Sequence, residues 1–447
     1  MEKRLYPRVK RRARVKLPGA GEGDSWDMSE RGLRLCTSEV ISSPDITLQI
    51  SFPDKKLQLK TKAKLIWRRD LQEGTFLYGV EFVSLGEQEK AVLRRELIES
   101  QISGMLNEIK NPEIRRGIQA FFLNDVLGYV NEITRLISLA ARAQGYSEEL
   151  EKKLEQLNHR ILLKGHCLEL LLSDAAVIQR VKDNFRHIVG TWIYKSGILK
   201  GAFDRPRGDR GAYKILEAIY DNRPLSQHIG AYLDNNFLKS PYAVAVRRRK
   251  DRMRELIGKF ICEAKEPKIR ILNVGCGSCR ELRELLPRLT ASNFVIITCL
   301  DWDEEALRFS HDLLLPLAPK NVELLFIKED VTRIIKGRDS RQRYGSQNLI
   351  YSAGLFDLLP DRALKKLLLV LYSFLLKGGR LVLTHQNREK TIPPIGPSWF
   401  CGLRFVARTA DEVTKLIYAC GISNFSLSVE SDDFGYMYYF TIGKKGV

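Results

Sequence analysis

The sequence predicts a multidomain protein with an N-terminal antiparallel β-barrel, a helical middle region and a C-terminal α/β, Rossmann-like domain with a mostly parallel sheet. Three observations support this fold class. Short runs of partly alternating apolar residues fill the first part of the chain, long helical patterns follow, and strands then alternate with helices to the end. We place the domain boundaries at residues 1–100, 101–260 and 261–447.

The barrel is predicted from short runs that are separated by Pro, Asp and Gly. The clearest are "DITLQISFP", "KLQLKTKAKLIWRR" and "FLYGVEFVSL", with no long helix between them. Regularly spaced short strands of this kind favour a small antiparallel barrel. At "GEQEKAVLRRELIES" the pattern changes to a helical one, and "EELEKKLEQLNHRILLKGHCLELLL" repeats Leu at helical spacing.

The third region alternates between the two kinds of element. We expect strands in "KIRILNVGCG", "NFVIITCLDW", "VELLFIKEDV", "NLIYSAGLFDLL" and "GGRLVLTHQN", with helices between them. This alternation predicts a parallel, doubly wound sheet. The closing run "SLSVESDDFGYMYYFTIG" predicts an antiparallel pair of strands at one edge.

The composition indicates a globular protein with an anionic partner. The 447 residues carry a formal net charge of +19, which suggests nucleic acid, a nucleotide, an anionic lipid or an acidic small molecule. Basic residues cluster at 3–16 and in "VRRRKDRMR", Val246 to Arg254, and a solvated basic face is the alternative for each. No window of about 18 apolar residues occurs, and the N-terminus lacks the apolar core of a signal peptide. We expect no transmembrane segment and a cytoplasmic location.

The eight cysteines show no regular disulfide spacing. Cys276 and Cys279 form C-x-x-C, but no second Cys pair or His pair accompanies it, so we expect no metal site.

A glycine turn follows the first strand of the third region, in "NVGCGSCRELRELL". Gly275 and Gly277 would let the backbone approach a ligand beside a helix N-terminus. Asp301 lies 24 residues after Gly277, at the end of the next apolar run, where parallel sheets present an acid to ribose hydroxyls. Asp303 is the expected cap of the following helix.

The neighbouring residues complete a predicted nucleotide site. Asp330, at the end of the third run, or the backbone beside it at Val331, would meet an adenine amino group. Trp302 would pack either on the adenine or in the core. For both acids, a role as helix cap or exposed loop residue is the alternative. The candidate cofactor-binding residues are Gly275, Cys276, Gly277, Asp301, Trp302, Asp330 and Val331.

The order of these motifs, followed by "LLKGGRLVL", resembles the class I S-adenosylmethionine (SAM) methyltransferases. "GCGSCRELRELL", "CLDWDEEAL", "LIYSAGLFDLLPDRALKKLL" and the "PRG-x-x-G-x-Y" block in "RPRGDRGAYKILEAIY" resemble a subfamily that makes methyl esters of 3-hydroxy fatty acids, including 3-hydroxypalmitic acid, as extracellular factors. The resemblance covers roughly residues 130–447. This chain departs from it at Asp209, Arg210 and Ala212, where Tyr, Ala and Asp are usual, and at His385, where Asn is common.

The resemblance implies in-line transfer of a methyl group to an acceptor such as a carboxylate, which is already nucleophilic. Arg205, Arg207 and Arg280 would hold an anionic acceptor, and packing of the helical segment on the sheet is the alternative for Arg205 and Arg207. Tyr351 and Asp357 follow the fourth strand, where such folds build the acceptor pocket. His385 would serve as a general base for a hydroxyl acceptor, or be structural. The candidate catalytic residues are Tyr351, Asp357, His385 and Arg207.

The first 100 residues resemble a PilZ domain, a barrel that binds cyclic di-GMP. Arg4 and Arg8 make R-x-x-x-R, with Arg8 and Arg12 as a second register, and Asp27, Ser29 and Gly32 make D-x-S-x-x-G. Arginine suits phosphate and guanine because it offers bidentate contacts and a stacking plane. The candidate cyclic di-GMP residues are Arg4, Arg8, Asp27, Ser29 and Gly32, and a barrel without a ligand is the alternative.

The sequence therefore predicts a cyclic di-GMP-responsive, SAM-dependent methyltransferase for a small acidic acceptor. One alternative is an inactive methyltransferase-like effector that acts through protein contacts. A nucleic-acid methyltransferase is the other, and the absence of a DPPY- or NPPY-like motif at "YSAGLFD" argues against it. The sequence leaves a homodimer open.

Overall fold

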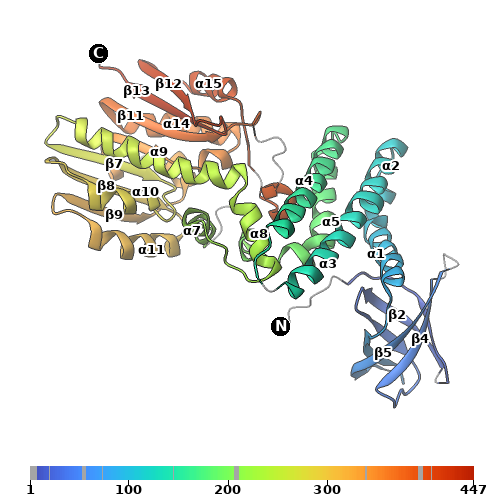
Figure 1. Cartoon of the computed structure of the whole chain (residues 1–447). Helices are drawn as coiled ribbons and strands as arrows, with labels where there is room; N and C mark the ends of the chain where they lie inside the picture. Colours follow the sequence, from blue (N-terminus) through green and yellow to red (C-terminus); the bar gives the residue numbers. More distant parts are fainter. Residues whose placement is uncertain are drawn as a thin grey trace. The chain divides into compact units, whose positions relative to one another are not determined.

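The structure, a computed structural model, describes residues 8–19, 21–52, 57–72, 74–143, 145–205, 211–337, 340–390, 396–403 and 405–446 (Figure 1). It divides into two compact units, Met1–Tyr194 and Lys195–Val447. The helical middle region of the sequence is thereby shared between the two units.

The first unit begins with the expected antiparallel barrel, which is closed. Its six strands are ordered β1-β2-β3-β6-β5-β4, and β4 pairs back onto β1. Alternate side chains point inward, among them Leu33, Leu48 and Ile50, all fully buried. The strands are β1 (Arg14–Leu17), β2 (Gly21–Ser29), β3 (Gly32–Thr37), β4 (Asp45–Phe52), β5 (Leu57–Asp70) and β6 (Phe76–Phe82).

A helical bundle completes the first unit. Helix α1 (Glu87–Glu108) packs Leu93 and Leu97 into the core of the barrel. The other helical segments are α2 (Pro112–Ala120), the π-helical η1 (Phe121–Val126), α3 (Leu127–Arg142), α4 (Glu148–Leu171) and α5 (Ala175–Ile193). No helix in the described part of the chain is long and apolar enough to cross a membrane.

The second unit contains a seven-stranded sheet with the order β12-β13-β11-β10-β7-β8-β9. Five strands are parallel, and β13 runs antiparallel to both β11 and β12, as the sequence predicts. The strands are β7 (Lys268–Val274), β8 (Phe294–Asp301), β9 (Val322–Lys328), β10 (Gln347–Ser352), β11 (Leu375–Gln386), β12 (Phe425–Ser431) and β13 (Met437–Lys444). The predicted fold class, an antiparallel barrel followed by a helical region and an α/β domain with a mostly parallel sheet, is confirmed.

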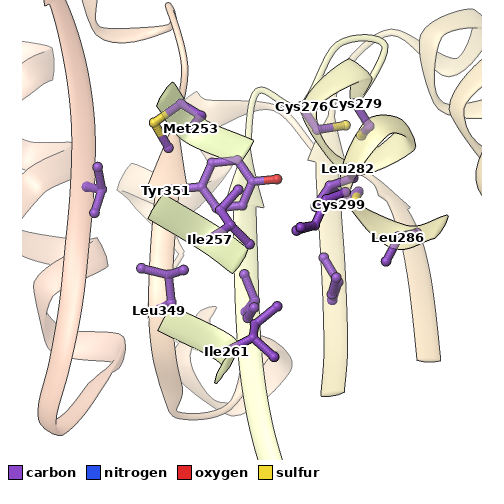
Figure 2. Packing of buried hydrophobic residues seen from close by; sticks show 14 of the residues in the cluster. Met253, Ile257, Ile261, Cys276, Cys279, Leu282, Leu286, Cys299, Leu349 and Tyr351 are labelled. Carbon is purple, nitrogen blue, oxygen red and sulfur yellow. The ribbon is translucent and has the colours of Figure 1, made fainter. Parts of the chain in front are cut away.

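Helices cover both faces of this sheet. On one face, Met253, Ile257 and Ile261 of α9 (Pro241–Glu263) pack on Leu349 and Tyr351 of β10 (Figure 2). The same cluster includes α10 (Arg280–Leu285) and α11 (Glu304–Leu314). The opposite face is covered by α12 (Val331–Lys336), α14 (Asp361–Phe374) and α15 (Ala410–Tyr418). Short segments complete the unit: η2 (Leu286–Arg288), η3 (Leu315–Leu317), α13 (Ser340–Tyr344), η4 (Phe356–Leu358) and η5 (Gly396–Phe400).

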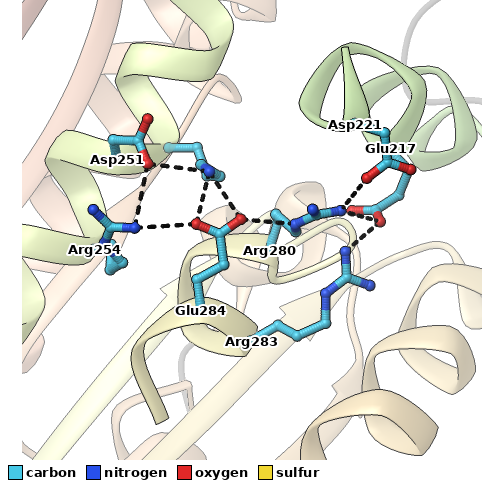
Figure 3. Close-up of polar contacts among 8 residues, drawn as sticks. Glu217, Asp221, Asp251, Arg254, Arg280, Arg283 and Glu284 are labelled. Carbon is cyan, nitrogen blue, oxygen red and sulfur yellow. Dashed lines mark hydrogen bonds and ion pairs between the residues drawn. The ribbon is translucent and has the colours of Figure 1, made fainter. Parts of the chain in front are cut away.

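Three further helices, α6 (Gly197–Asp204), α7 (Tyr213–Asp221) and α8 (Ile229–Leu238), precede α9 in the second unit. Helix α7 is fixed to α10 by charge (Figure 3). Arg280 contacts Glu217 at 3.0 Å and Asp221 at 2.9 Å, and Arg283 also pairs with Glu217. Glu284 extends the network to α9.

The basic cluster Val246 to Arg254 is engaged within the second unit, because α9 carries it over several acceptors. Lys250 and Arg254 pair with Glu284, and Arg252 pairs with Glu430. Arg247 donates to the Leu238 carbonyl at 2.9 Å. Much of the positive charge of this segment therefore stabilises the fold.

Candidate functional site

The candidate site lies at the carboxyl ends of the parallel strands, at the point in the sheet where the strand order reverses. Strand β7 lies between β10 and β8, so the connections after β7 and β10 leave the sheet on opposite faces. Such a reversal opens a crevice in which α/β proteins bind ligands. A cavity of about 630 Å³ lies here.

The glycine turn after β7 forms one wall of this cavity. Gly275 and Gly277 have φ angles of +70° and +54°, in the left-handed region that favours glycine. The amides of Gly275 and Cys276 donate to the Leu300 carbonyl at 2.9 and 3.0 Å. A Cβ on Gly277 would meet no atom within 4 Å, so the turn presents bare backbone to open space.

Asp301 holds this turn in place from the end of β8. Its Oδ2 accepts from the Gly277 amide at 2.7 Å, and its Oδ1 accepts from the Asp303 amide at 3.0 Å. Burial raises the pKa of the Asp301 carboxyl, although these two amide hydrogen bonds favour its charged form. Asp301 lines the cavity, and the Trp302 amide also hydrogen-bonds its carboxyl. A carboxylate has about four lone-pair sites, so Asp301 retains acceptor capacity for a further donor.

The predicted cap role of Asp303 is confirmed, and the structure adds a second role. Its Oδ1 accepts from the Glu305 amide at 3.0 Å at the start of α11. Its Oδ2 accepts from the Gly211 amide at 2.7 Å, which fixes the end of the "PRG-x-x-G-x-Y" block beside the glycine turn.

Three more of the predicted nucleotide residues also lie at the cavity. Trp302 and Val331 line it, and the Trp302 side chain is 41% exposed. Asp330 lines it as well, but its carboxylate caps α12 by accepting from the Thr332 amide at 2.6 Å. Its neighbour Glu329 is buried at the same wall and accepts from Arg343 at 2.6 Å and from Tyr344.

Cys276 lies behind the turn rather than on the cavity wall. Its sulfur lies within 4.8 Å of those of Cys279 and Cys299, and all three residues are buried (Figure 2). Sequence reasoning found the C-x-x-C pair and missed Cys299, because β8 brings it close only in the fold.

The candidate residue Tyr351 is fully buried and lies beneath the site. Its hydroxyl donates to Glu281 Oε1 at 2.9 Å, and Asn273 Nδ2 donates to the same oxygen at 3.2 Å. Burial raises the pKa of Glu281 to about 8, and the nearby Cys279 adds to the shift. The position of Tyr351 suits a residue that supports the turn through α10.

His385 is also fully buried, and its ring is engaged on both sides. Arg408 Nη1 lies 2.9 Å from Nε2, and because arginine can only donate, Nε2 accepts. Nδ1 then carries the proton and donates to the Gln386 carbonyl at 3.1 Å, with Asp357 Oδ1 at 3.3 Å. The geometry suits the structural alternative for His385.

Among the candidate catalytic residues that the structure describes, Asp357 lines the cavity. It is fully buried, and its Oδ1 accepts from the Gln386 amide at 2.7 Å. Its Oδ2 lies 3.9 Å from Nη1 of Arg249, which also lines the cavity. Sequence reasoning missed Arg249, because it stands within a run of basic residues.

The other candidate arginines differ in their relation to the cavity. Arg205 lines the cavity, and Arg207 lies outside the described residues. Arg280 was expected to hold an anionic acceptor, and the structure instead places its guanidinium in the ion pairs that fix α7 to α10 (Figure 3).

Among the described residues, acids outnumber bases on the cavity wall. The acids are Asp301, Asp303, Glu329, Asp330 and Asp357, and the bases are Arg205 and Arg249. This balance is opposite in sign to the net charge of the whole chain.

The second candidate site lies on the barrel. Arg8 Nη1 donates to Asp27 Oδ1 at 2.7 Å, and Arg34 donates to Asp27 Oδ2 through Nε at 2.8 Å and through Nη2. Burial raises the pKa of Asp27, but the hydrogen bonds from Arg34 and Arg8 outweigh it and hold the pKa below its usual value. Sequence reasoning missed Arg34, which β3 places opposite Asp27.

The other motif residues shape the turn between β2 and β3. Ser29 Oγ donates to the Gly32 carbonyl at 3.1 Å, and a Cβ on Gly32 would collide with the Val80 carbonyl oxygen. Arg4 lies outside the described residues.

Comparisons with known proteins agree with this geometry. A family model described as "Putative methyltransferase" matches residues 207–442, which is more than half of the chain. The chain belongs to this methyltransferase family. A model of the PilZ domain matches residues 2–99, so the barrel is a PilZ domain. No curated protein matches the chain.

Solved structures share parts of the methyltransferase chain at low identity. A "possible exported protein" from Bordetella parapertussis is 18% identical, with a TM-score of 0.45, covering 76% of this chain and all of that one. The magnesium protoporphyrin IX methyltransferase of Synechocystis PCC 6803 with bound SAM is 13% identical, with a TM-score of 0.33, covering 46% of this chain and 85% of that one. A DUF574 family protein from Streptomyces avermitilis is 14% identical, with a TM-score of 0.39, covering 52% and 97%.

Proposed function

We propose that this protein is a SAM-dependent methyltransferase that methylates a small carboxylate and responds to cyclic di-GMP. In this proposal residues 1–100 bind the dinucleotide and residues 261–447 bind the cofactor. The helical region 101–260 supplies acceptor contacts through the helices that belong to the second unit. The main support for the proposal is the position of Asp301, which accepts a hydrogen bond from the Gly277 amide in the glycine turn and also lines the cavity.

The residues present fit a cofactor of this kind. Gly277 offers bare backbone to open space, Asp301 keeps lone pairs for ribose hydroxyls, and the indole of Trp302 offers a flat apolar face. The excess of carboxyl groups among the described residues of the cavity wall suits a sulfonium cation. When bound, SAM would supply an electrophilic methyl group.

The chain's own residues bind, orient and exclude water. The acceptor side of the cavity is largely apolar, with Ile215, Leu216 and Ile219 from α7 and Leu403 and Phe405 from the segment before α15. Such a wall removes water from an acceptor carboxylate, which then needs no general base. The apolar wall supports a fatty acid, such as a 3-hydroxy fatty acid, as the acceptor.

The PilZ domain would bind cyclic di-GMP at Arg8, Arg34 and Asp27, with Arg4, Ser29 and Gly32 of the two motifs. The basic segment that contains Arg8 and Arg11, here called the basic arm, is linked to α1, because Arg11 pairs with Glu96 at 3.3 Å. Arg94 of α1 pairs with Glu30, beside the motif turn, and donates to Asn131 of α3 at 2.9 Å. A ligand that reorders the arm would therefore act on α1 and on the bundle.

Calorimetry and an assay with radiolabelled SAM test this proposal with the full chain. We expect SAM to bind, the dinucleotide to bind, and label to pass to an added 3-hydroxy fatty acid. Binding of the dinucleotide without binding of SAM would contradict the enzyme proposal and favour the inactive effector. Equal turnover with and without the dinucleotide would contradict regulation alone.

A further inference from the structure

Arg249 occupies an unusual position on α9. The helix buries one stripe, in which Val246, Met253, Ile257 and Ile261 are apolar and Arg249 is the charged member. Arg249 is 5% exposed, yet it lines the cavity. A guanidinium stays charged even when buried, so this position needs an anionic partner.

Asp357 supplies this anionic partner only in part. Asp357 Oδ2 lies 3.9 Å from Arg249 Nη1, beyond hydrogen-bond distance. Among the described residues, Arg249 Nε and Asp357 Oδ2 are both buried without a hydrogen-bond partner. One donor and one acceptor thus remain unused at the same end of the cavity.

The pair is closely packed on one side and has aromatic residues beside it on another. The guanidinium lies against Gly354, where a Cβ would come within 2.7 Å of Nη1, and the Tyr220 hydroxyl interacts with it. Beside it runs an aromatic wall, in which Tyr242 lies 6.1 Å from Phe237 and 5.7 Å from Phe405, measured between ring centroids. An ion pair with one unused donor and one unused acceptor, next to an aromatic wall, suits an amphipathic ligand with a polar head.

We propose that Arg249 and Asp357 recognise the head of the methyl acceptor, a carboxylate with a hydrogen-bond donor such as a hydroxyl on a nearby carbon. Arg249 binds one carboxylate oxygen, Asp357 Oδ2 accepts from the hydroxyl, and the apolar chain lies along Phe237, Tyr242 and Phe405. This inference rests on the proposed function and assigns its acceptor site.

The reaction balances without a proton transfer at this site. The free carboxylate oxygen forms the C–O bond to the methyl group, the S–C bond breaks, and its electron pair stays on sulfur. The negative charge of the acceptor disappears in the ester, so its ion pair with Arg249 is lost. Arg249 therefore favours bound acid over product, and its removal should raise KM more than it lowers kcat.

Calorimetry on the full chain, with S-adenosylhomocysteine present, tests the site with three probes: 3-hydroxydecanoate, decanoate and 3-hydroxydecanamide. We expect the wild type to prefer the acid to the amide and the hydroxy acid to decanoate. Arg249→Met should reduce the first preference by about tenfold or more, because charge-assisted hydrogen bonds are the strong ones. Asp357→Asn keeps an acceptor for the Gln386 amide and replaces Oδ2 by a donor, so it should remove the second preference.

Two further variants serve as controls. Arg248→Met removes the same charge from the adjacent position of α9, which faces Asp433 at 3.6 Å, and should leave both preferences intact. Arg249→Lys keeps a charge and should retain part of the preference for the acid, which a purely structural role would not predict.

The outcomes separate this inference from the proposed function. If Arg249→Met binds S-adenosylhomocysteine normally and keeps the full preference for the acid, Arg249 does not recognise the acceptor. If the wild type binds S-adenosylhomocysteine but none of the acids, the acceptor site is wrong and the cofactor site stands. If S-adenosylhomocysteine does not bind, the proposed function fails, and the same titrations without it still test Arg249.

Discussion

Asp301 and Asp303 stand two residues apart and do different work. Asp301 faces the cavity and holds Gly277, whereas Asp303 caps α11 and holds Gly211. We expect Asp301→Ala to weaken SAM binding by about tenfold or more, because it removes a charged acceptor from the site. Asp303→Ala should mainly lower the free energy of unfolding, by about 1–2 kcal/mol, as for a lost cap. Calorimetry and urea unfolding measure the two effects, and equal losses of SAM affinity would contradict this division.

Glu281 gives the methyltransferase unit a pH dependence. Its folded pKa of about 8 lies above the ordinary glutamate value, so the folded state holds a proton that the unfolded state releases. Stability from this group is complete below the unfolded pKa and is lost as the pH rises through the folded pKa. The free energy of unfolding should therefore fall by a few kcal/mol between about pH 5 and about pH 8.

The matched variant is Glu281→Gln, which keeps an acceptor for Tyr351 and Asn273 and does not titrate. Urea unfolding at both ends of this pH range should show a smaller fall in the variant than in the wild type. An unchanged slope would mean that another group titrates.

The role of a single residue can be predicted from the sequence when its partners are close in the sequence. It is missed when the fold brings in partners from distant segments. Asp303 is identifiable as a cap because the helix it begins is adjacent. Arg249 belongs to a basic segment, and its partner Asp357 lies far along the chain. Arg280 pairs locally with Glu284, but its other partners, Glu217 and Asp221, are also distant in the sequence. A usable signal for Arg249 was its place on the apolar stripe of α9, at helical spacing from Val246 and Met253. The i,i+4 spacing of Arg280 and Glu284 was a local signal for an ion pair, but the two partners that α7 supplies have no local signal.

Helix α7 forms part of the proposed acceptor wall. It lines the cavity through Ile215, Leu216 and Ile219, and Glu217 fixes it to α10 (Figure 3). We expect Glu217→Gln to lower the free energy of unfolding by about 1–3 kcal/mol, because two guanidinium groups lose a partly buried partner. It should also weaken acceptor binding more than SAM binding.

Asp221→Asn is the control, since that side chain is 53% exposed and its pair with Arg280 should contribute at most about 1 kcal/mol. Urea unfolding and calorimetry compare the two variants. A Glu217→Gln protein as stable as Asp221→Asn would show that packing alone holds α7.

The elements themselves follow from local patterns more closely than their roles do. Alternation predicts the barrel, and alternating strands and helices predict the parallel sheet with its antiparallel edge. The sequence pattern gave no sign that the helical middle region is divided between two units near Tyr194. Helical periodicity continues on both sides of that point, and only the packing partners change.

In the proposed function, the molecule as a whole carries two ligand sites, one on each unit. If cyclic di-GMP changes SAM affinity by some factor, SAM must change cyclic di-GMP affinity by the same factor. Titrating each ligand with and without the other measures this reciprocity. We expect Arg8→Ala to weaken dinucleotide binding by about tenfold or more and to abolish the coupling, with SAM affinity alone unchanged. A coupling that persists in Arg8→Ala at saturating dinucleotide would place the response elsewhere.

Each proposed ligand site includes an exposed tryptophan or a residue beside one in the sequence. Trp302 lines the cavity and is 41% exposed, and Trp26, which precedes Asp27 in the sequence, is 52% exposed. Trp192 and Trp399 are buried, so of the five tryptophans just one other, Trp67, is strongly exposed. Indole emission shifts in colour and intensity when water leaves the ring. A Trp67→Phe protein would therefore carry an optical reporter for each ligand, and a further Trp→Phe change at either site would assign the signal without any dye.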